Sequence, residues 1–158
     1  RLRRALATGT ILLDGHNICW RTPALAAAMQ ADSEAGRRAL ENRIRRARHR
    51  TIAFYDGGPD GRSGMQYRNG LRCLYSGSRS ADDQIIAQLR RFQERAVLVS
   101  DDRELIGRGR AHGALACGVL EYLSWLDEGP GKASEDGNRH VDLTDDEVTM
   151  WVRLFEGE

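Results

Sequence analysis

The stretch "ILLDGHNICW" (residues 11–20) is a run of branched apolar side chains that ends in the carboxylate of Asp14 and continues as Gly-His-Asn. Runs that are apolar at successive positions are typical of strands buried on both faces of a parallel sheet. A carboxylate at the end of such a strand is costly to place there unless it is exposed, capped or bound to a cation. The pattern therefore predicts a strand at residues 10–14 whose last residue needs a chemical explanation.

Four further apolar runs follow this strand and alternate with stretches of helical periodicity. Strands are expected at residues 51–56, 71–76, 96–101 and 112–117. Helices are expected at residues 23–30 and 34–48, as one or two helices, and at residues 81–92, 102–109 and 118–126. This order predicts an α/β fold, a three-layer sandwich with a mostly parallel central sheet joined by right-handed crossovers.

The composition is that of a folded globular chain. Its 158 residues are 41% hydrophobic and 30% charged, with the charges interspersed among apolar runs, so one sizeable core is expected. No stretch reaches the roughly 18 apolar residues of a membrane span, and no signal-peptide pattern is visible. Cys19, Cys73 and Cys117 are widely spaced and odd in number, which favours buried thiols in a reducing compartment. We therefore expect a cytoplasmic protein without a membrane partner.

Charge is divided unevenly along the chain. Residues 1–126 carry a net charge of +8 and residues 127–158 a net charge of −7. We expect the first range to form the folded domain, and the second to hold an acidic linker, "DEGPGKASEDGN", followed by a C-terminal helix. Thr144 and Glu147 have the spacing of a capping box at the start of that helix. Its apolar face and its acidic charge suggest docking on the basic body.

The basic residues themselves allow two interpretations. All but one of the 24 are arginines, which suit bidentate contact with phosphate, although the codon bias of a genome gives the same enrichment. Aromatic residues make up only 6% of the chain, so an extended base-stacking platform is not predicted.

Acidic residues gather where the predicted strands end. They are Asp14, Asp56, Asp101 and Asp102, and a further pair, Asp82 and Asp83, opens the helix in "SRSADDQII". Because the carboxyl ends of parallel strands meet at one edge of a sheet, these side chains are expected to converge there.

Helix capping explains each acid taken alone. Ser80 with Asp83, and Asp101 with Glu104, have the spacing of helix caps. Several carboxylates held together repel one another, however, so a cluster of them indicates a bound cation. Asp82 is the better ligand of its pair, because the residues three and four positions later are isoleucines that face the core. Asp83 points more laterally, where capping suits it.

Four segments in order, "ILLDGHNICW", "AFYDGG", "YSGSRSADDQI" and "VLVSDDRELIGRGRAHGA", resemble the successive motifs of the YacP-type NYN domains, a branch of the PIN-like ribonucleases. The resemblance spans residues 10–117 and implies a PIN-like, Rossmann-like sandwich with an acidic pocket that binds Mg²⁺ or Mn²⁺ and cleaves RNA. His16 replaces the usual Tyr of the family and Ser80 the usual Thr, which leaves the carboxylates intact.

The resemblance, together with the chemistry of the residues, gives the expected site. Asp14, Asp82 and Asp101 are expected to be the catalytic residues and metal ligands. The supporting residues are expected to be Asn17, Asp56, Asp83, Ser100 and Asp102. RNA phosphates are expected to contact Arg62 and Arg68 of the Gly-rich loop at residues 57–64, and Arg79 and Arg103 beside the acids.

The function that follows is a metal-dependent endoribonuclease acting on single-stranded RNA, with mRNA and ribosome-associated RNA as candidate substrates and the oligomeric state left open. The alternative is a non-catalytic RNA- or ribosome-binding module on the same fold, which would need no divalent metal. A phosphatase built on an Asp-x-Asp strand end is excluded, because His16 occupies the place of the second acid.

Overall fold

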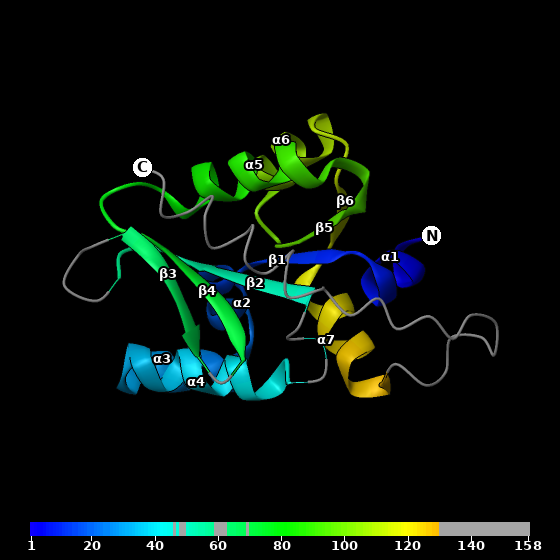
Figure 1. Cartoon of the computed structure of the whole chain (residues 1–158). Coiled ribbons are helices and arrows are strands. Elements are labelled where there is room, and N and C mark those ends of the chain that lie inside the picture. Colours follow the sequence, from blue (N-terminus) through cyan, green and yellow to red (C-terminus); the bar gives the residue numbers. More distant parts are fainter. Residues whose placement is uncertain (46, 48–49, 59–62, 69, 130–158) are drawn as a thin grey trace.

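The computed structural model describes residues 1–129 except residues 46, 48–49, 59–62 and 69. In this part of the chain six strands form one sheet in the order β3-β4-β2-β1-β5-β6, with only β3 antiparallel to its neighbour (Figure 1). The strands are β1 (Thr10–Asp14), β2 (Thr51–Tyr55), β3 (Ser63–Arg68), β4 (Leu71–Ser76), β5 (Ala96–Val99) and β6 (Leu115–Cys117). The helices are α1 (Leu2–Thr8), α2 (Gly15–Arg21), α3 (Pro23–Ala31), α4 (Ser33–Arg43), α5 (Ala81–Phe92), α6 (Arg103–Ala111) and α7 (Val119–Glu128), with a 3-10 turn η3 at Gln93–Arg95.

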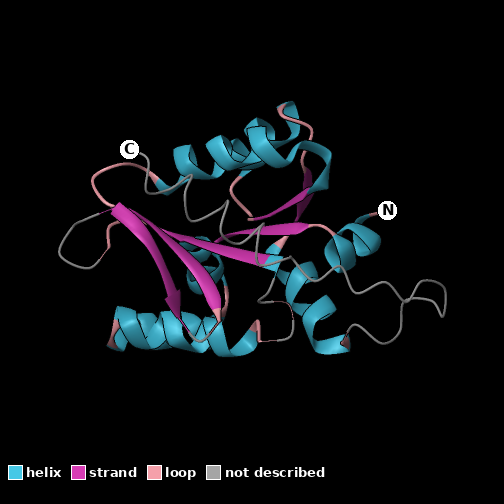
Figure 2. Ribbon diagram, in the orientation of Figure 1, coloured by secondary structure: helices cyan, strands magenta, loops and turns pink. Residues whose placement is uncertain are grey.

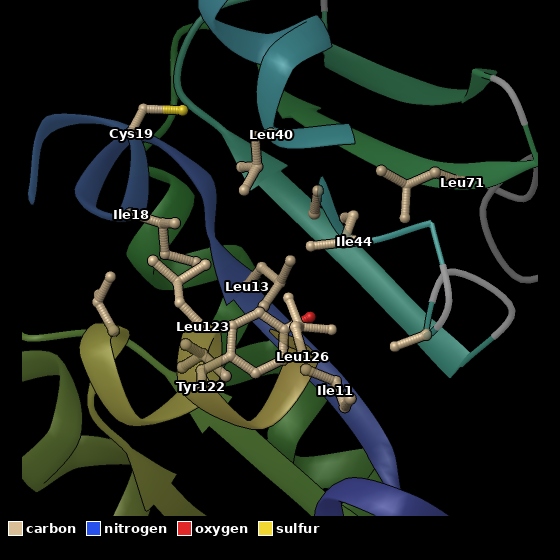
Figure 3. Packing of buried hydrophobic residues seen from close by; sticks show 14 of the residues in the cluster. Ile11, Leu13, Ile18, Cys19, Leu40, Ile44, Leu71, Tyr122, Leu123 and Leu126 are labelled. Atoms are coloured by element: carbon tan, nitrogen blue, oxygen red, sulfur yellow. The ribbon is translucent and has the colours of Figure 1, made fainter. Parts of the chain in front are cut away.

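Helices cover both faces of the sheet, which gives the three layers (Figure 2). Along β1 the side chains alternate: Leu12 packs in the cluster of α5 and α6, whereas Ile11 and Leu13 pack in the cluster of α1–α4 and α7. Figure 3 shows Leu13 beside Tyr122 and Leu123 of α7 in the second cluster. Burying each aliphatic side chain of this size contributes about 1.5–3 kcal/mol. The predicted α/β sandwich with a mostly parallel sheet is confirmed.

Three elements differ from the sequence expectation. Two helices were not predicted: α1, which precedes β1, and α2, which begins directly after Asp14. The predicted Gly-rich loop at residues 57–64 gives way to β3 at Ser63. Since β3 lies at the sheet edge and most of its side chains are exposed, it lacks the apolar pattern that marks the other strands.

Helix α7 extends beyond the predicted domain boundary at residue 126. It continues to Glu128, and two ion pairs join its end to the body: Arg43 Nη2 to Asp127 at 3.2 Å and Arg3 Nη1 to Glu128 at 2.6 Å. The predicted C-terminal helix lies outside the described residues. The first two acids of the acidic segment therefore belong to a helix that packs on the core.

The strand order has a switch point between β1 and β5. From β1 the chain passes through α2–α4 on one face to β2, whereas α5 on the other face leads from β4 to β5 on the opposite side of β1. In open α/β sheets, ligands bind outside the carboxyl ends of the strands at such a point. Asp14 is the last residue of β1 and Ser100 directly follows β5, so both stand at it.

Candidate active site

Asp14 is held in place by Ser100. The Ser100 hydroxyl, which is fully buried, donates a 2.8 Å hydrogen bond to Asp14 Oδ2 and accepts the backbone N–H of Asp102 at 3.1 Å. Asp14 itself is only 8% exposed. The carboxylate at the switch point is thus fixed to the start of the β5–α6 connection.

Electrostatic coupling joins Asp14 to other acids at this edge. Burial raises the pKa of the Asp14 carboxyl to about 6; the hydrogen bond from Ser100 opposes this, and the charges of Asp82 and Asp102 add to it. The pKa of Asp82 is also raised, first by burial and then by Asp102 and Asp56. We call Asp14, Asp56, Asp82 and Asp102 the carboxylate cluster.

Asp101 and Asp102 have different surroundings. Asp102 Oδ1 accepts the backbone N–H groups of Glu104 and Leu105, so Asp102 is the N-cap of α6. Asp101 Oδ1 accepts the N–H of Val119 at 3.0 Å and is thereby directed to the start of α7. The cap that the sequence predicted at Asp101 is therefore formed by Asp102.

Asn17 connects α2 to the end of β5. Its Oδ1 accepts the backbone N–H of Asp101 at 2.8 Å. The sequence predicted that Asn17 supports the site. In the structure Asn17 fixes the backbone at Asp101.

Asp56 lies one residue after β2 and reaches two elements. Its Oδ1 accepts the N–H of Ala81 at 2.9 Å, at the start of α5, and its Oδ2 lies 3.5 Å from His16 Nδ1. Asp83 is directed away and pairs with Arg108 at 3.0 Å, while Ser80 caps α5 through the N–H of Asp82. These contacts place Asp56 beside the start of α5. Asp83, for which the sequence favoured capping, instead pairs with α6.

Gly15 lets the chain turn from β1 into α2 close to the next strand. A Cβ at this position would lie 2.4 Å from Cε1 of Tyr55 and 2.8 Å from the carbonyl oxygen of Phe54. Any larger residue would push α2 away from β2. The Asp-Gly pair therefore combines a site carboxylate with the close approach that positions it.

The four predicted RNA-binding arginines are distributed differently from the expectation. Arg79 and Arg103 are exposed, in the connection to α5 and at the start of α6. Arg62 lies outside the described residues.

Arg68 does not lie in the Gly-rich loop near the acids, and that expectation was wrong. It ends β3 and pairs in register with Leu71 at the beginning of β4, which is the end of the sheet opposite to the site. Its guanidinium forms an ion pair with Glu34, lies 3.6 Å from Glu41 Oε1 and donates to the Tyr75 hydroxyl. Since its side chain is only 20% exposed, Arg68 connects the sheet to α4.

A family model for the YacP-like NYN domain matches residues 11–148. The chain belongs to this family. The YacP-like NYN domain is a nuclease-type family, and membership of it supports an RNase-type function. The matched range runs past residue 126 into the acidic segment.

Two solved structures share the fold of this NYN domain. A crystal structure of Rae1 (YacP) from Bacillus subtilis in its W164L form has a TM-score of 0.62 and 19% identity, and covers 76% of each chain. A second crystal structure of Rae1 (YacP) from Bacillus subtilis has a TM-score of 0.57 and 21% identity, and covers 75% of this chain and 74% of the other. No curated protein matches the sequence.

The NYN domain offers hard oxygen donors, the type of ligand that Mg²⁺ and Mn²⁺ prefer. Among the described residues, however, no three His, Cys, Asp or Glu side chains come close enough together to form a metal-binding group. Mg²⁺ commonly binds through one or two carboxylates and keeps several waters. The carboxylate cluster fits that mode, rather than a cage of three direct ligands.

The described part of the chain contains no helix with the length and apolar character needed to cross a membrane.

The sequence ranked Asp101 above Asp102. In the structure the charge of Asp102 raises the pKa values of Asp14 and Asp82, whereas Asp101 accepts a hydrogen bond from the start of α7. Both acids follow β5, so their distance from the strand does not tell which one couples to Asp14. The start of α6 distinguishes the two acids, because Asp102 is the N-cap of this helix and Asp101 is not.

We expect the stability of the metal-free protein to depend on ionisation of Asp14. Because its folded-state pKa of about 6 exceeds the ordinary value near 4, folding favours the protonated form. The penalty is absent below about pH 4, grows between about pH 4 and 6 and is complete above that, at about 2–3 kcal/mol. Asp14→Asn should therefore stabilise the protein in EDTA at about pH 7.5 and change little at about pH 4.

Denaturant unfolding of both proteins at the two pH values, in EDTA, measures this difference. Mn²⁺ at a hundred times its Kd should add about 2.7 kcal/mol to the wild type and little to the variant. A variant that is less stable than the wild type at both pH values would mean that Asp14 serves only as a hydrogen-bond acceptor for Ser100.

Proposed function

We propose that this NYN domain is a metal-dependent endoribonuclease that cleaves single-stranded RNA at the carboxylate cluster. The observation that carries the proposal is the buried Asp14, fixed by Ser100 at the switch point and coupled to Asp82 and Asp102. A buried acid with its pKa raised by neighbouring acids, at the ligand-binding edge of an α/β sheet, is typical of a functional site. Membership of a nuclease-type family supports the same reaction class.

Asp14 and Asp82 would hold Mg²⁺ or Mn²⁺, with Asp101 and Asp102 acting directly or through water. A bound metal supplies an activated water and stabilises charge on the phosphate. Without a cation the carboxylates would repel the RNA backbone, so a bound cation would also strengthen RNA binding.

The chain's own residues position these groups. Ser100 holds Asp14 through its hydroxyl, and Asn17 holds the backbone at Asp101. Asp56 links the end of β2 to the start of α5 and so sets the position of Asp82. Each of these bonds joins an acid-bearing segment to another strand or helix, which keeps the acids together despite their repulsion.

The test is cleavage of a labelled single-stranded RNA by the wild-type protein with Mg²⁺, with Mn²⁺ and with EDTA. Internal cleavage with either metal and none in EDTA is expected. Free mRNA fragments and ribosome-bound mRNA are the two substrates to compare, because the proposal includes both. Cleavage that persists in EDTA would contradict the metal-dependent mechanism.

One observation favours the second candidate, a non-catalytic RNA- or ribosome-binding module. The described residues bring no three metal-binding side chains together. Such a module would bind RNA equally well in Mg²⁺ and in EDTA, and would leave it intact in both.

Arg79 and Arg103 are exposed at the site edge and are proposed to contact phosphates of the RNA. Arg79→Ala and Arg103→Ala should each weaken RNA binding and reduce the slope of log affinity against log salt by about 0.7. The salt dependence of binding to a short single-stranded RNA measures this. Wild-type slopes in both variants would show that these arginines are only solvated surface charges.

A further inference from the structure

Trp20 is a large aromatic side chain left exposed on the helix that begins at the site. Its exposed fraction is 52%, whereas Trp125, on α7, is 8% exposed. Helix α2 starts directly after Asp14, so only five residues separate Asp14 from Trp20. An indole in this position lies close to the proposed reaction centre without being part of the core.

The core-facing side of α2 is occupied by other residues. Gly15, Ile18 and Cys19 are buried, and Figure 3 shows Ile18 and Cys19 among the core side chains. Residues three and four positions apart share a helix face. Trp20 is five positions after Gly15, so it does not share the buried face. It is exposed and projects from the other side of α2.

That other side faces the acids. His16 lies 3.5 Å from Asp56, and Asn17 accepts the N–H of Asp101. Trp20 follows His16 by four positions and Asn17 by three, so it lies one helical turn beyond them on the same face. Trp20 therefore shares a face of α2 with His16 and Asn17, and both of these side chains contact segments that carry acids.

Helix geometry also inclines the indole towards the site. In an α-helix the Cα–Cβ bonds tilt towards the N-terminus, which for α2 is the end at Asp14. One turn rises about 5.4 Å. The ring is therefore inclined towards a nucleotide that would adjoin a phosphate at the carboxylate cluster, and the exposed Arg21 follows Trp20 directly in the chain.

We propose that Trp20 stacks on an unpaired base next to the scissile phosphate and so makes the site selective for single-stranded RNA. This inference rests on the proposed function, because it places the phosphate at the carboxylate cluster. Bases stack on exposed aromatic rings whatever their identity, and duplex bases have both faces covered. Trp20 is thus a specificity-determining residue. A single aromatic ring is enough to stack on one base, so no extended stacking platform is needed.

The test measures binding of an eight-nucleotide single-stranded RNA in EDTA, where cleavage does not interfere. Trp20→Ala should weaken binding about tenfold or more, and Trp20→Phe, which keeps an aromatic ring, should retain most of the affinity. The matched control is Tyr67→Ala. Tyr67 is 51% exposed but lies on β3 opposite Arg72, at the far end of the sheet, so its removal should leave binding unchanged.

A set of RNAs with one abasic nucleotide each provides a second readout on the unaltered protein. One position should weaken wild-type binding as much as Trp20→Ala does, and combining that RNA with Trp20→Ala should cause no further loss. Equal losses in Trp20→Ala and Tyr67→Ala, or additive losses at every abasic position, would overturn the stacking role.

The outcomes separate this inference from the proposed function. A wild type that cleaves RNA with metal, together with Trp20→Ala that binds single-stranded RNA normally, overturns only the role of Trp20. A wild type that neither binds nor cleaves single-stranded RNA overturns both.

Discussion

Replacing Asp14 by Asn is expected to lower the rate of metal-dependent RNA cleavage by at least about a hundredfold. The reason is position: Asp14 is the buried carboxylate at the switch point, and no exposed neighbour can substitute for its charge there. Asn keeps an oxygen that accepts the Ser100 hydroxyl, so the local structure should persist. The measurement is kcat/KM on a labelled single-stranded RNA in Mn²⁺, with a thermal melt to establish folding.

A set of matched variants makes this result specific. Asp82→Asn should resemble Asp14→Asn, and Asp127→Asn, an exposed acid at the far end of α7, should cleave like the wild type. Comparing Asp101→Asn with Asp102→Asn decides which acid after β5 belongs to the reaction; the electrostatic coupling to Asp14 favours Asp102. Cleavage at wild-type rates in Asp14→Asn and Asp82→Asn would place the reaction elsewhere in the protein.

Replacing Arg68 by Ala should destabilise the protein by about 3 kcal/mol and leave RNA binding by the folded protein unchanged. The variant leaves the buried carboxylate of Glu41, whose side chain is 1% exposed, without its cation. Burial raises the pKa of Glu41, and Arg68 opposes that rise, so the loss of Arg68 favours protonation or unfolding. Glu34 loses the hydrogen bond that chiefly lowers its pKa to about 2.

Denaturant unfolding of the single variant and of Arg68→Ala combined with Glu41→Gln measures the effect. The double variant should recover part of the lost stability, because the unpaired charge is gone. Arg79→Ala is the converse control, since it should weaken RNA binding and leave stability unchanged. A stable Arg68→Ala protein with reduced RNA affinity would restore the RNA-binding role that the sequence suggested.

The sequence by itself determined the parallel core of the sheet and the position of Asp14 at its edge. The strands β1, β2, β4 and β5 are buried along almost their whole length. Burial favours apolar residues at successive positions, so each strand can be predicted from its own segment of sequence. An acid that directly follows such a strand must lie at the sheet edge whatever the rest of the chain does. Helix α5 could also be predicted from its own sequence, because apolar residues recur at helical spacing along one of its faces.

Only the tertiary structure decided which polar side chains meet. Strand β3 exists because β4 offers it hydrogen-bonding partners, and its own exposed side chains carry no strand pattern. Its pairing carries Arg68 to the end of the sheet opposite to the acids and onto Glu41 of α4. Likewise Asp101 and Asp102 are adjacent in sequence, yet hydrogen bonds to α7 and α6 direct their carboxylates differently. These outcomes depend on partners distant in the chain, which local sequence patterns do not specify.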